Sequence, residues 1–479
     1  MKKKGIKRRK RASFKVSSVG PFLLALFIVI AVIAAAFLAV AFSIIEIPLM
    51  DDRLIFCAAV VLLLTVVLAF ALTAISDSRR TAANGEALEA IISEAERVLN
   101  EEHEITPPTA TAPPENKNEG HAKKRFPRLC AMDGTEKETV ISEKETTLSA
   151  LCDDFRNYAA YEKGLYYDKK TVRAFVSGLS VSHLMIIQGM SGTGKTSLAC
   201  AFGDFLKRPA ALIPVQPSWK EKTDLIGYYN EFTGIYNETE LLATLYGAGR
   251  TDSVCITVLD EMNIARVEYY FAEFLSVLEM PEAKRRIIGI TPSGMDGDPE
   301  GMTDGRLLLP ENVWYIGTAN NDDSTVAISD KVYDRASVIT LDKRAFPFDA
   351  KRTEPRKLSY NELEGLFEGA RRRYGLTLRS RRRIEKLDEY LSENFGISFG
   401  NRIMHQLERL VPVYVACGGD ELEAVDTVLA GKVLRKLGSK NPVFVRNSVS
   451  SLYGMLDELF GEGSMPSCRA ALSVYGKNS

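Results

Sequence analysis

The sequence predicts an α/β protein that is attached to a membrane by two N-terminal helices. Three observations support this fold class: two long apolar runs near the N-terminus, short apolar strands that alternate with helical segments further on, and a glycine-rich loop between one such strand and the next helix. We expect five regions: a basic N-terminus (1–20), a transmembrane helical hairpin (21–76), a helix with a Pro/Thr-rich linker (77–148), an α/β domain (149–345), and a helical domain with a C-terminal tail (346–479).

The composition excludes several classes of protein. The chain has 479 residues, of which 46% are hydrophobic and 26% charged, and this balance excludes a mostly disordered protein. Seven cysteines without paired metal-binding spacing exclude a disulfide scaffold or a zinc ribbon. The formal charge of −1 hides an uneven distribution, because residues 1–15 carry nine Lys/Arg and no acid, which leaves −10 for the remainder.

Two apolar runs are long enough to cross a bilayer. Phe22–Ile45 has 24 residues with one polar side chain, and Leu54–Ile75 has 22 with two threonines. At about 1.5 Å per residue, each exceeds the ~30 Å hydrocarbon core. Buried core helices or a cleaved signal peptide are the alternatives, but the first run is longer than the apolar part of a signal peptide and a second run follows at once.

The flanking charges predict the orientation of this hairpin. Basic residues precede the first run and follow the second at Arg79 and Arg80, whereas the connection Glu46–Arg53 holds three acids and one base. Because Lys and Arg stay on the cytoplasmic side, we expect a two-span protein of a bacterial or archaeal cell membrane with both termini cytoplasmic. The basic N-terminus also fits a nucleic-acid-binding arm, although its position favours contact with anionic lipid.

The segment between the hairpin and the α/β domain is predicted to be a spacer. Gly85–Glu104 has the apolar spacing of an amphipathic helix or short coiled coil, and Thr106–Gly120 is rich in Pro and Thr, which is typical of a semi-rigid tether. Residues 121–145 are polar, so the folded soluble part is predicted to begin near Ser149.

A glycine-rich loop follows the apolar strand Leu184–Gln188. Residues 189–196 read GMSGTGKT, which fits G-x-x-x-x-G-K-[ST], and a helix follows. In this pattern backbone N–H groups and the helix N-terminus bind phosphate oxygens, the lysine reaches the β- and γ-phosphates, and the hydroxyl binds Mg²⁺. The alternative is a plain glycine-rich turn. We predict a site for a nucleoside triphosphate with Mg²⁺ at Gly189, Met190, Ser191, Gly192, Thr193, Gly194, Lys195, Thr196 and Ser197.

Polar residues follow two further apolar strands. Val254–Leu259 ends in Asp260 and Glu261, so we expect Asp260 to bind the Mg²⁺ together with Thr196, and Glu261 to polarise the attacking water. A solvated strand end is the alternative. Val313–Thr318 leads to Asn320 and Asn321. Asn320 is the better candidate to orient the attacking water, and Asn321 is the second candidate. The alternative is an ordinary asparagine-rich turn.

One arginine has the position of a residue that acts on a neighbouring subunit. Arg335 follows the predicted helix Ser329–Tyr333 and precedes the strand Ser337–Leu341. An arginine at a subunit edge can reach the γ-phosphate held by the next subunit and stabilise the charge that develops there. An ordinary surface arginine is the alternative.

Taken together, the segments GMSGTGKT, VLDEMNIARVEYY, PENVWYIGTANNDDST and SDKVYDRA resemble the AAA+ family, and within it the branch of McrB-type restriction motors, MoxR-like ATPases and dynein-related modules. The resemblance covers about Leu165 to Leu459. It implies a doubly wound parallel sheet, a helical lid at roughly 358–459, and a homo-oligomeric ring, expected to be a hexamer. It also implies that Arg402 occupies the sensor-2 position, where an arginine contacts the γ-phosphate of its own subunit; a helix-start arginine is the alternative.

Two loops are candidates for the lining of a central pore. Residues 224–236 carry Tyr228, Tyr229, Phe232 and Tyr236, although at least two of these aromatics are expected to pack within the fold. Residues 281–310 form a long connection, and the resemblance implies a β-hairpin there.

These features predict a membrane-anchored AAA+ ATPase that couples ATP binding and hydrolysis to remodelling or assembly of an unidentified protein partner. A nucleotide-gated ring scaffold, or a McrB-like motor that works with a nuclease partner, are the alternatives. McrB-type motors hydrolyse GTP, but the segment after Asn320 differs here, so we expect ATP as the nucleotide. The soluble part is acidic, so direct nucleic-acid binding is not expected.

Overall fold

The computed structural model describes residues 124–141, 145–320 and 325–476. The predicted basic N-terminus, both predicted membrane spans, the amphipathic helix and the Pro/Thr-rich tether lie outside these ranges, as does Asn321. Among the helices in the described ranges, none is long and apolar enough to cross a bilayer.

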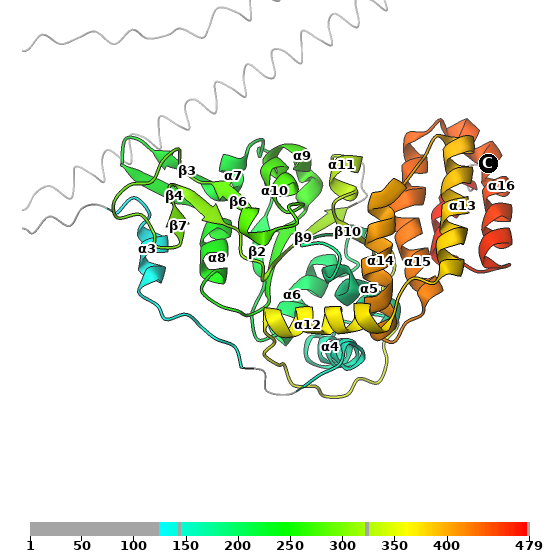
Figure 1. Ribbon diagram of the computed structural model, residues 1–479, viewed down its shortest axis with the longest axis horizontal. Coiled ribbons are helices and arrows are strands. Elements are labelled where there is room, and N and C mark those ends of the chain that lie inside the picture. Colours follow the sequence, from blue (N-terminus) through cyan, green and yellow to red (C-terminus); the bar gives the residue numbers. More distant parts are fainter. Residues whose placement is uncertain (1–123, 142–144, 321–324, 477–479) are drawn as a thin grey trace, which may run out of the picture. The chain divides into compact units, whose positions relative to one another are not determined.

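A five-stranded sheet forms the centre of the α/β region (Figure 1), and every pair of neighbouring strands is parallel. The strand order is β10-β1-β9-β5-β2. The strands are β1 (Leu184–Gly189), β2 (Ala211–Pro214), β5 (Cys255–Asp260), β9 (Val313–Asn320) and β10 (Ser337–Thr340). Because the strands are parallel, their carboxyl ends meet at one edge, and Gly189 there pairs with Asn320.

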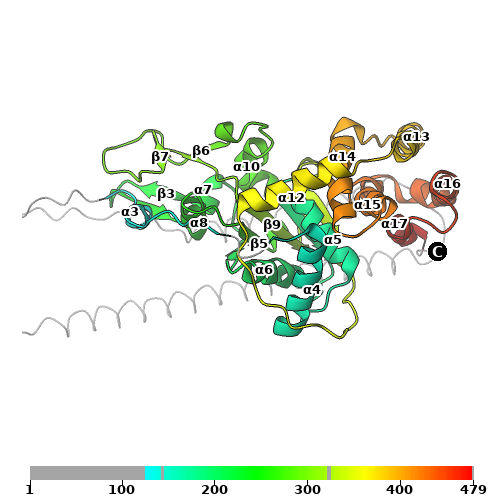
Figure 2. The ribbon, with the colours of Figure 1, turned by 60° about the horizontal axis from the view of Figure 1, so that its bottom comes forward.

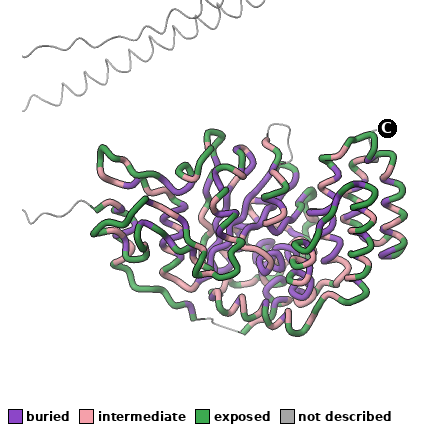
Figure 3. Tube along the Cα trace, turned by 45° about the horizontal axis from the view of Figure 1, so that its top comes forward, coloured by how far each residue is buried: buried purple, intermediate pink, exposed green. Residues whose placement is uncertain are grey.

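Helices cover both faces of this sheet, as the prediction of a doubly wound core requires. Successive residues of a strand point to opposite faces, so Met185 and Ile187 join one hydrophobic cluster whereas Leu184 and Ile186 join the other. Strands β1, β5, β9 and β10 are buried along most of their length, whereas the edge strand β2 buries only Ile213. Figure 3 shows buried residues gathered in the interior of this region. The first face packs against α4 (Leu148–Lys163), α5 (Lys169–Leu179) and α6 (Lys195–Phe205), and the second mainly against α8 (Glu240–Ala248), α9 (Val267–Tyr270) and α10 (Ala272–Val277).

The folded part begins earlier than the polarity of residues 121–145 led us to expect. Helix α3 (Pro127–Asp133) lies against α8, and Phe126 just before it is fully buried, with its ring 4.8 Å from that of Tyr236. Arg125 forms an ion pair with Asp298, and both side chains are only 10% exposed. A few buried anchors therefore hold a largely polar stretch, which hydropathy alone does not reveal.

The C-terminal part is helical, as predicted. Its longer helices are α12 (Tyr360–Arg373), α13 (Leu378–Phe395), α14 (Gly400–Ala416), α15 (Glu421–Val428), α16 (Pro442–Phe460) and α17 (Pro466–Gly476). Figures 1 and 2 show α12 lying along the α/β region, where Tyr360 contacts Trp314 and Arg371 donates a hydrogen bond to the carbonyl of Ser180. One hydrophobic cluster runs from the sheet into α13–α17, so the two parts share a core.

The two predicted pore loops both contain antiparallel strands. β3 (Gly227–Asn230) and β4 (Ile235–Glu238) form a hairpin; β6 (Ile287–Gly289) and β7 (Met302–Thr303) both pair with β8 (Arg306–Leu308). Of the four aromatics in the first loop, Tyr236 is buried whereas Tyr228 and Phe232 are more than half exposed. Their role in a pore stays a prediction.

Candidate functional site

The glycine-rich loop connects β1 to the N-terminus of α6. Gly189, Gly192 and Gly194 have φ angles of 144°, 74° and 94°, which L side chains rarely adopt. At Gly189 a Cβ would lie 2.3 Å from the carbonyl oxygen of Leu341, so this position requires glycine. The loop thus turns tightly into the helix, and the first N–H groups of α6 face the position where phosphate binds in such loops.

The ammonium group of Lys195 lies over this loop. It is 6% exposed and donates hydrogen bonds to the carbonyls of Gly189 (3.1 Å) and Met190 (2.7 Å). Two further side chains brace the loop from outside: Tyr167 donates to the carbonyl of Gly194 at 3.0 Å, and Arg344 donates to the carbonyl of Gly192 from two nitrogens at 2.9 and 2.7 Å. Neither was predicted from the sequence, because each comes from a distant segment.

A hydrogen-bonded chain connects the loop to the end of β5. The Thr196 hydroxyl donates to Asp260 Oδ1 at 2.7 Å, and the Thr318 hydroxyl donates to the same oxygen at 2.8 Å. Thr318 in turn accepts a hydrogen bond from the backbone N–H of Glu261 at 2.9 Å. The structure therefore brings Thr196, Asp260 and the backbone of Glu261 together and adds Thr318, a buried residue of β9.

Glu261 has a left-handed backbone, with φ 51° and ψ 45°. Such a conformation costs a non-glycine residue on the order of 1–2 kcal/mol, and residues held in it often belong to functional sites. Two hydrogen bonds hold this backbone conformation. The Thr318 hydroxyl accepts from the Glu261 N–H, and the Ile264 N–H donates to the Glu261 carbonyl at 2.9 Å. Glu261 itself is exposed to solvent.

Asn320 ends β9 next to the glycine-rich loop, and Asn263 holds it there. The Asn263 side chain donates to the Asn320 carbonyl at 2.8 Å and accepts from the Asn320 N–H at 3.3 Å. Both asparagines line a cavity of about 320 Å³, together with Gln188 and Arg435. Asn263 was not predicted from the sequence; its position three residues after Asp260 is the signal that could have indicated it.

Arg335 and Arg402 lie side by side on one carboxylate. Glu279 binds Arg335 Nε at 2.7 Å and Arg402 Nη2 at 3.1 Å. The structure thus groups the residue predicted to act on a neighbouring subunit with the one predicted to act within its own subunit. Their roles toward a γ-phosphate stay predictions.

A different arginine from the helical part lines the cavity at the end of β1. Arg435 lies in the 3-10 turn η4 (Leu434–Ser439), 3.7 Å above the ring of Tyr333, and forms an ion pair with Asp330. The Tyr333 hydroxyl donates to Gln188 Oε1 at 2.7 Å. Arg435 was not predicted from the sequence, because only its contacts with Tyr333 and Asp330 of α11 (Asp330–Tyr333) bring it there.

The side chains around the loop suit Mg²⁺ with a triphosphate. A hydroxyl and a carboxylate are hard oxygen ligands, and Mg²⁺ in nucleotide sites typically takes one or two such groups besides phosphate oxygens and water. Burial raises the pKa of Asp342 beside Gly189, and the positive charge of Lys195 opposes that rise.

Part of the chain is similar to a known protein. Over 201 residues the chain is 24% identical to the McrB subunit of the type IV methyl-directed restriction enzyme of Escherichia coli K12. That region covers 40% of this chain and 41% of the subunit, so less than half of the relative is matched. No family model matches the chain.

Solved structures resemble part of this chain with low TM-scores, as two examples show. A crystal structure described as a "putative ATPase" of Cytophaga hutchinsonii ATCC 33406 has a TM-score of 0.40 at 14% identity, covering 59% of this chain and 84% of that one. A full-length MCM homolog of Methanopyrus kandleri has a TM-score of 0.32 at 14% identity, covering 59% and 58%.

Proposed function

We propose that this chain is a Mg²⁺-dependent ATP hydrolase of the AAA+ type. The observation that carries this proposal is the hydrogen-bonded chain Thr196–Asp260–Thr318–Glu261 directly beside the glycine-rich loop. It combines a phosphate-binding loop, two oxygen ligands for Mg²⁺ and a glutamate whose strained backbone is held by hydrogen bonds. A phosphate-binding protein without hydrolytic activity has no need for the last of these.

Each residue has a distinct task in hydrolysis. The loop N–H groups and Lys195 bind the β- and γ-phosphates, and Thr196 with Asp260 would hold the Mg²⁺. The bound ion would neutralise charge that develops on the phosphate oxygens. Glu261 polarises the attacking water, and Asn320 orients it beside the γ-phosphate.

The active form in this proposal is a ring. Arg335 lies outside the glycine-rich loop's own hydrogen-bond network and binds Glu279 at the surface, so we infer that it serves the nucleotide of a neighbouring subunit. The side chain is 25% exposed, and it must leave Glu279 to do so. We propose a homo-oligomer, with a hexamer as the expected size.

We further propose that the two apolar runs at residues 22–45 and 54–75 anchor this ring in a bacterial or archaeal cell membrane with both termini in the cytoplasm. In this proposal ATP turnover remodels or assembles a protein partner at the membrane. The similarity to McrB favours a second candidate, a motor that works with a separate nuclease. An ATPase rate that does not change on addition of DNA or RNA would argue against this second candidate.

The test is ATP turnover by the full-length chain and two variants. Lys195→Ala should abolish binding of Mg²⁺-ATP in calorimetry, whereas Glu261→Gln should bind it and lose about 10²–10⁴-fold in turnover, the usual contribution of a general base. If the wild-type chain binds no Mg²⁺-ATP, or if Glu261→Gln hydrolyses at the wild-type rate, the proposal is wrong.

A further inference from the structure

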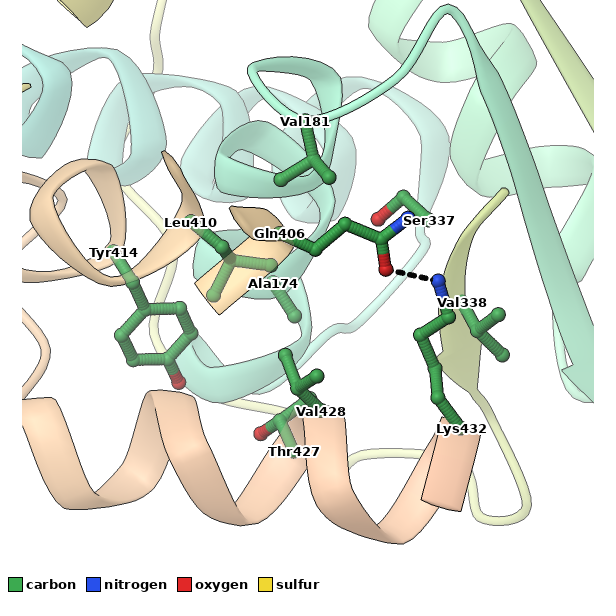
Figure 4. A pocket seen from close by; sticks show the side chains of 10 residues that line it. All are labelled: Ala174, Val181, Ser337, Val338, Gln406, Leu410, Tyr414, Thr427, Val428 and Lys432. Atoms are coloured by element: carbon green, nitrogen blue, oxygen red, sulfur yellow. Dashed lines mark hydrogen bonds between the residues drawn. The ribbon is translucent and has the colours of Figure 1, made fainter. Parts of the chain in front are cut away.

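Lys432 is a buried cation of the helical part. It lies in the π-helical turn η3 (Leu429–Val433), is only 4% exposed, and borders a small cavity of about 20 Å³. Its ammonium group donates hydrogen bonds to the carbonyls of Ala336 (2.7 Å) and Asp334 (3.4 Å) and to Gln406 Oε1. Figure 4 shows the Lys432 ammonium group and the Gln406 side-chain oxygen pointing toward each other among the residues that line this cavity. Because burial of a charge is costly, its retention here needs a reason.

The two carbonyls that Lys432 binds belong to the residues on either side of Arg335. Gln406 of α14 adds a hydrogen bond to the Asp334 carbonyl at 2.9 Å, and Lys436 of η4 forms an ion pair with the Asp334 carboxylate at 3.2 Å. Three side chains of the helical part therefore hold the backbone from which Arg335 projects. Within the α/β region, the Arg335 side chain donates hydrogen bonds to Glu279 and to the Lys331 carbonyl, and the Arg335 carbonyl accepts one from the Ser182 hydroxyl at 2.8 Å.

Burial and the neighbouring charges make the hydrogen bonds of Lys432 depend on its protonation state. Burial lowers the pKa of Lys432 to about 7, Asp334 opposes this shift, and the cations Lys436, Arg402 and Arg435 add to it. A neutral amine has two N–H donors for the three oxygens that face it, whereas the ammonium group has three. Loss of the proton therefore removes one of the three hydrogen bonds that Lys432 donates, and loss of the side chain removes all three.

We propose that Lys432 is a positioning residue for Arg335, so that the helical part of one subunit sets the rate of hydrolysis in the nucleotide site of its neighbour. This inference rests on the proposed function. Arg335 must be placed accurately to reach a γ-phosphate on another chain, and a misplacement of about 1 Å can lower a rate on the order of 10²-fold. The packing of Lys432 and Gln406 links that placement to α14 and η3.

The proposal is tested by mixing subunits of the full-length chain. Lys432→Met keeps a side chain of similar length and removes the donor, and it should lower kcat about 10- to 100-fold without raising KM. Glu261→Gln subunits cannot hydrolyse but keep a correctly placed Arg335. A mixed ring places Lys432→Met subunits next to Glu261→Gln subunits, and their shared site combines an intact Glu261 with an intact Arg335.

We expect the mixture to hydrolyse ATP faster than either variant alone, because about a quarter of the interfaces in a random one-to-one ring combine an intact Glu261 with a correctly placed Arg335. Arg335→Ala mixed with Glu261→Gln is the positive control. Lys440→Met is the matched control, because Lys440 binds the carbonyl of Gly396 within the helical part and not the Arg335 segment; it should keep the wild-type kcat.

The outcomes separate this inference from the proposed function. If the Arg335→Ala mixture recovers and the Lys432→Met mixture does not, Lys432 acts within its own subunit and the inference is overturned while the ATPase stands. If neither mixture recovers, Arg335 does not act on a neighbour and the inference also falls. If Lys432→Met does not fold, Gln406→Leu, which removes the Gln406 donor to Asp334, undergoes the same mixing test.

Discussion

Replacement of Thr318 by valine should separate catalysis from nucleotide binding. Thr318 is 2% exposed, and its hydroxyl both donates to Asp260 and accepts from the Glu261 N–H. Valine has nearly the same shape but no hydroxyl, so the substitution removes both hydrogen bonds with little change in packing. The Glu261 backbone then loses one of the two contacts that hold its left-handed conformation.

The expected magnitudes follow from these two bonds. A hydrogen bond to a charged group contributes about 1.5–3 kcal/mol, and the Glu261 N–H can regain water, so we expect the free energy of unfolding to fall by about 2 kcal/mol. The carboxylate of Glu261 becomes free to relax, and displacement of a catalytic group by about 1 Å costs on the order of 10²-fold. We therefore expect kcat to fall about 10- to 100-fold while the affinity for ATP changes little.

The assay is steady-state ATP turnover together with calorimetric binding and chemical denaturation. Thr318→Ser keeps the hydroxyl and should keep most of the activity. Thr257→Val is the matched control on the adjacent strand β5: its hydroxyl is fully buried and has no hydrogen-bond partner among the described residues, so its loss should leave kcat unchanged and stability equal or higher. A Thr318→Val protein with the wild-type kcat would refute the reasoning.

Two further predictions concern stability. Phe126→Ala should lower the free energy of unfolding by about 3 kcal/mol, because the ring is fully buried against Tyr236. Ile141→Ala, at an 81% exposed position, is the control and should have little effect. Equal denaturation midpoints for the two variants would contradict the packing of residues 124–140 against the α/β region. Burial lowers the pKa of His183 from 6.5 to about 4, while its Nδ1 hydrogen-bonds the Val313 carbonyl. The unfolded chain therefore binds more protons than the native one between these pH values, so stability falls on acidification by about 2 kcal/mol from pH 7 to pH 5. His183→Gln should flatten this part of the profile in denaturant titrations, and an unchanged slope would show that His183 is not its source.

A third stability prediction concerns the opposite end of the pH range. Because the pKa of Lys432 is about 7 in the native state and 10.5 as its ordinary value, the native chain binds fewer protons between them, and stability should rise with pH across this window. Lys432→Met should remove this rise, by up to about 1.4 kcal/mol per pH unit for one proton.

The sequence by itself determined the parts of the site that are contiguous or that follow a strand. The glycine-rich loop, its lysine and the two residues after β5 are local patterns, because a phosphate is bound by successive backbone N–H groups and parallel strands bring their carboxyl ends to one edge. The α/β class and the helical C-terminal part followed in the same way from periodicity along the chain.

Only the tertiary structure decided which distant residues meet. Thr318 reaches Asp260 because β5 and β9 are neighbours, and Arg435 reaches the cavity because η4 packs against α11. The attachment of Lys432 to the Arg335 segment joins residues almost a hundred positions apart. Such contacts depend on the geometry of packing, which is a property of surfaces in three dimensions and leaves no periodic trace in the order of the amino acids.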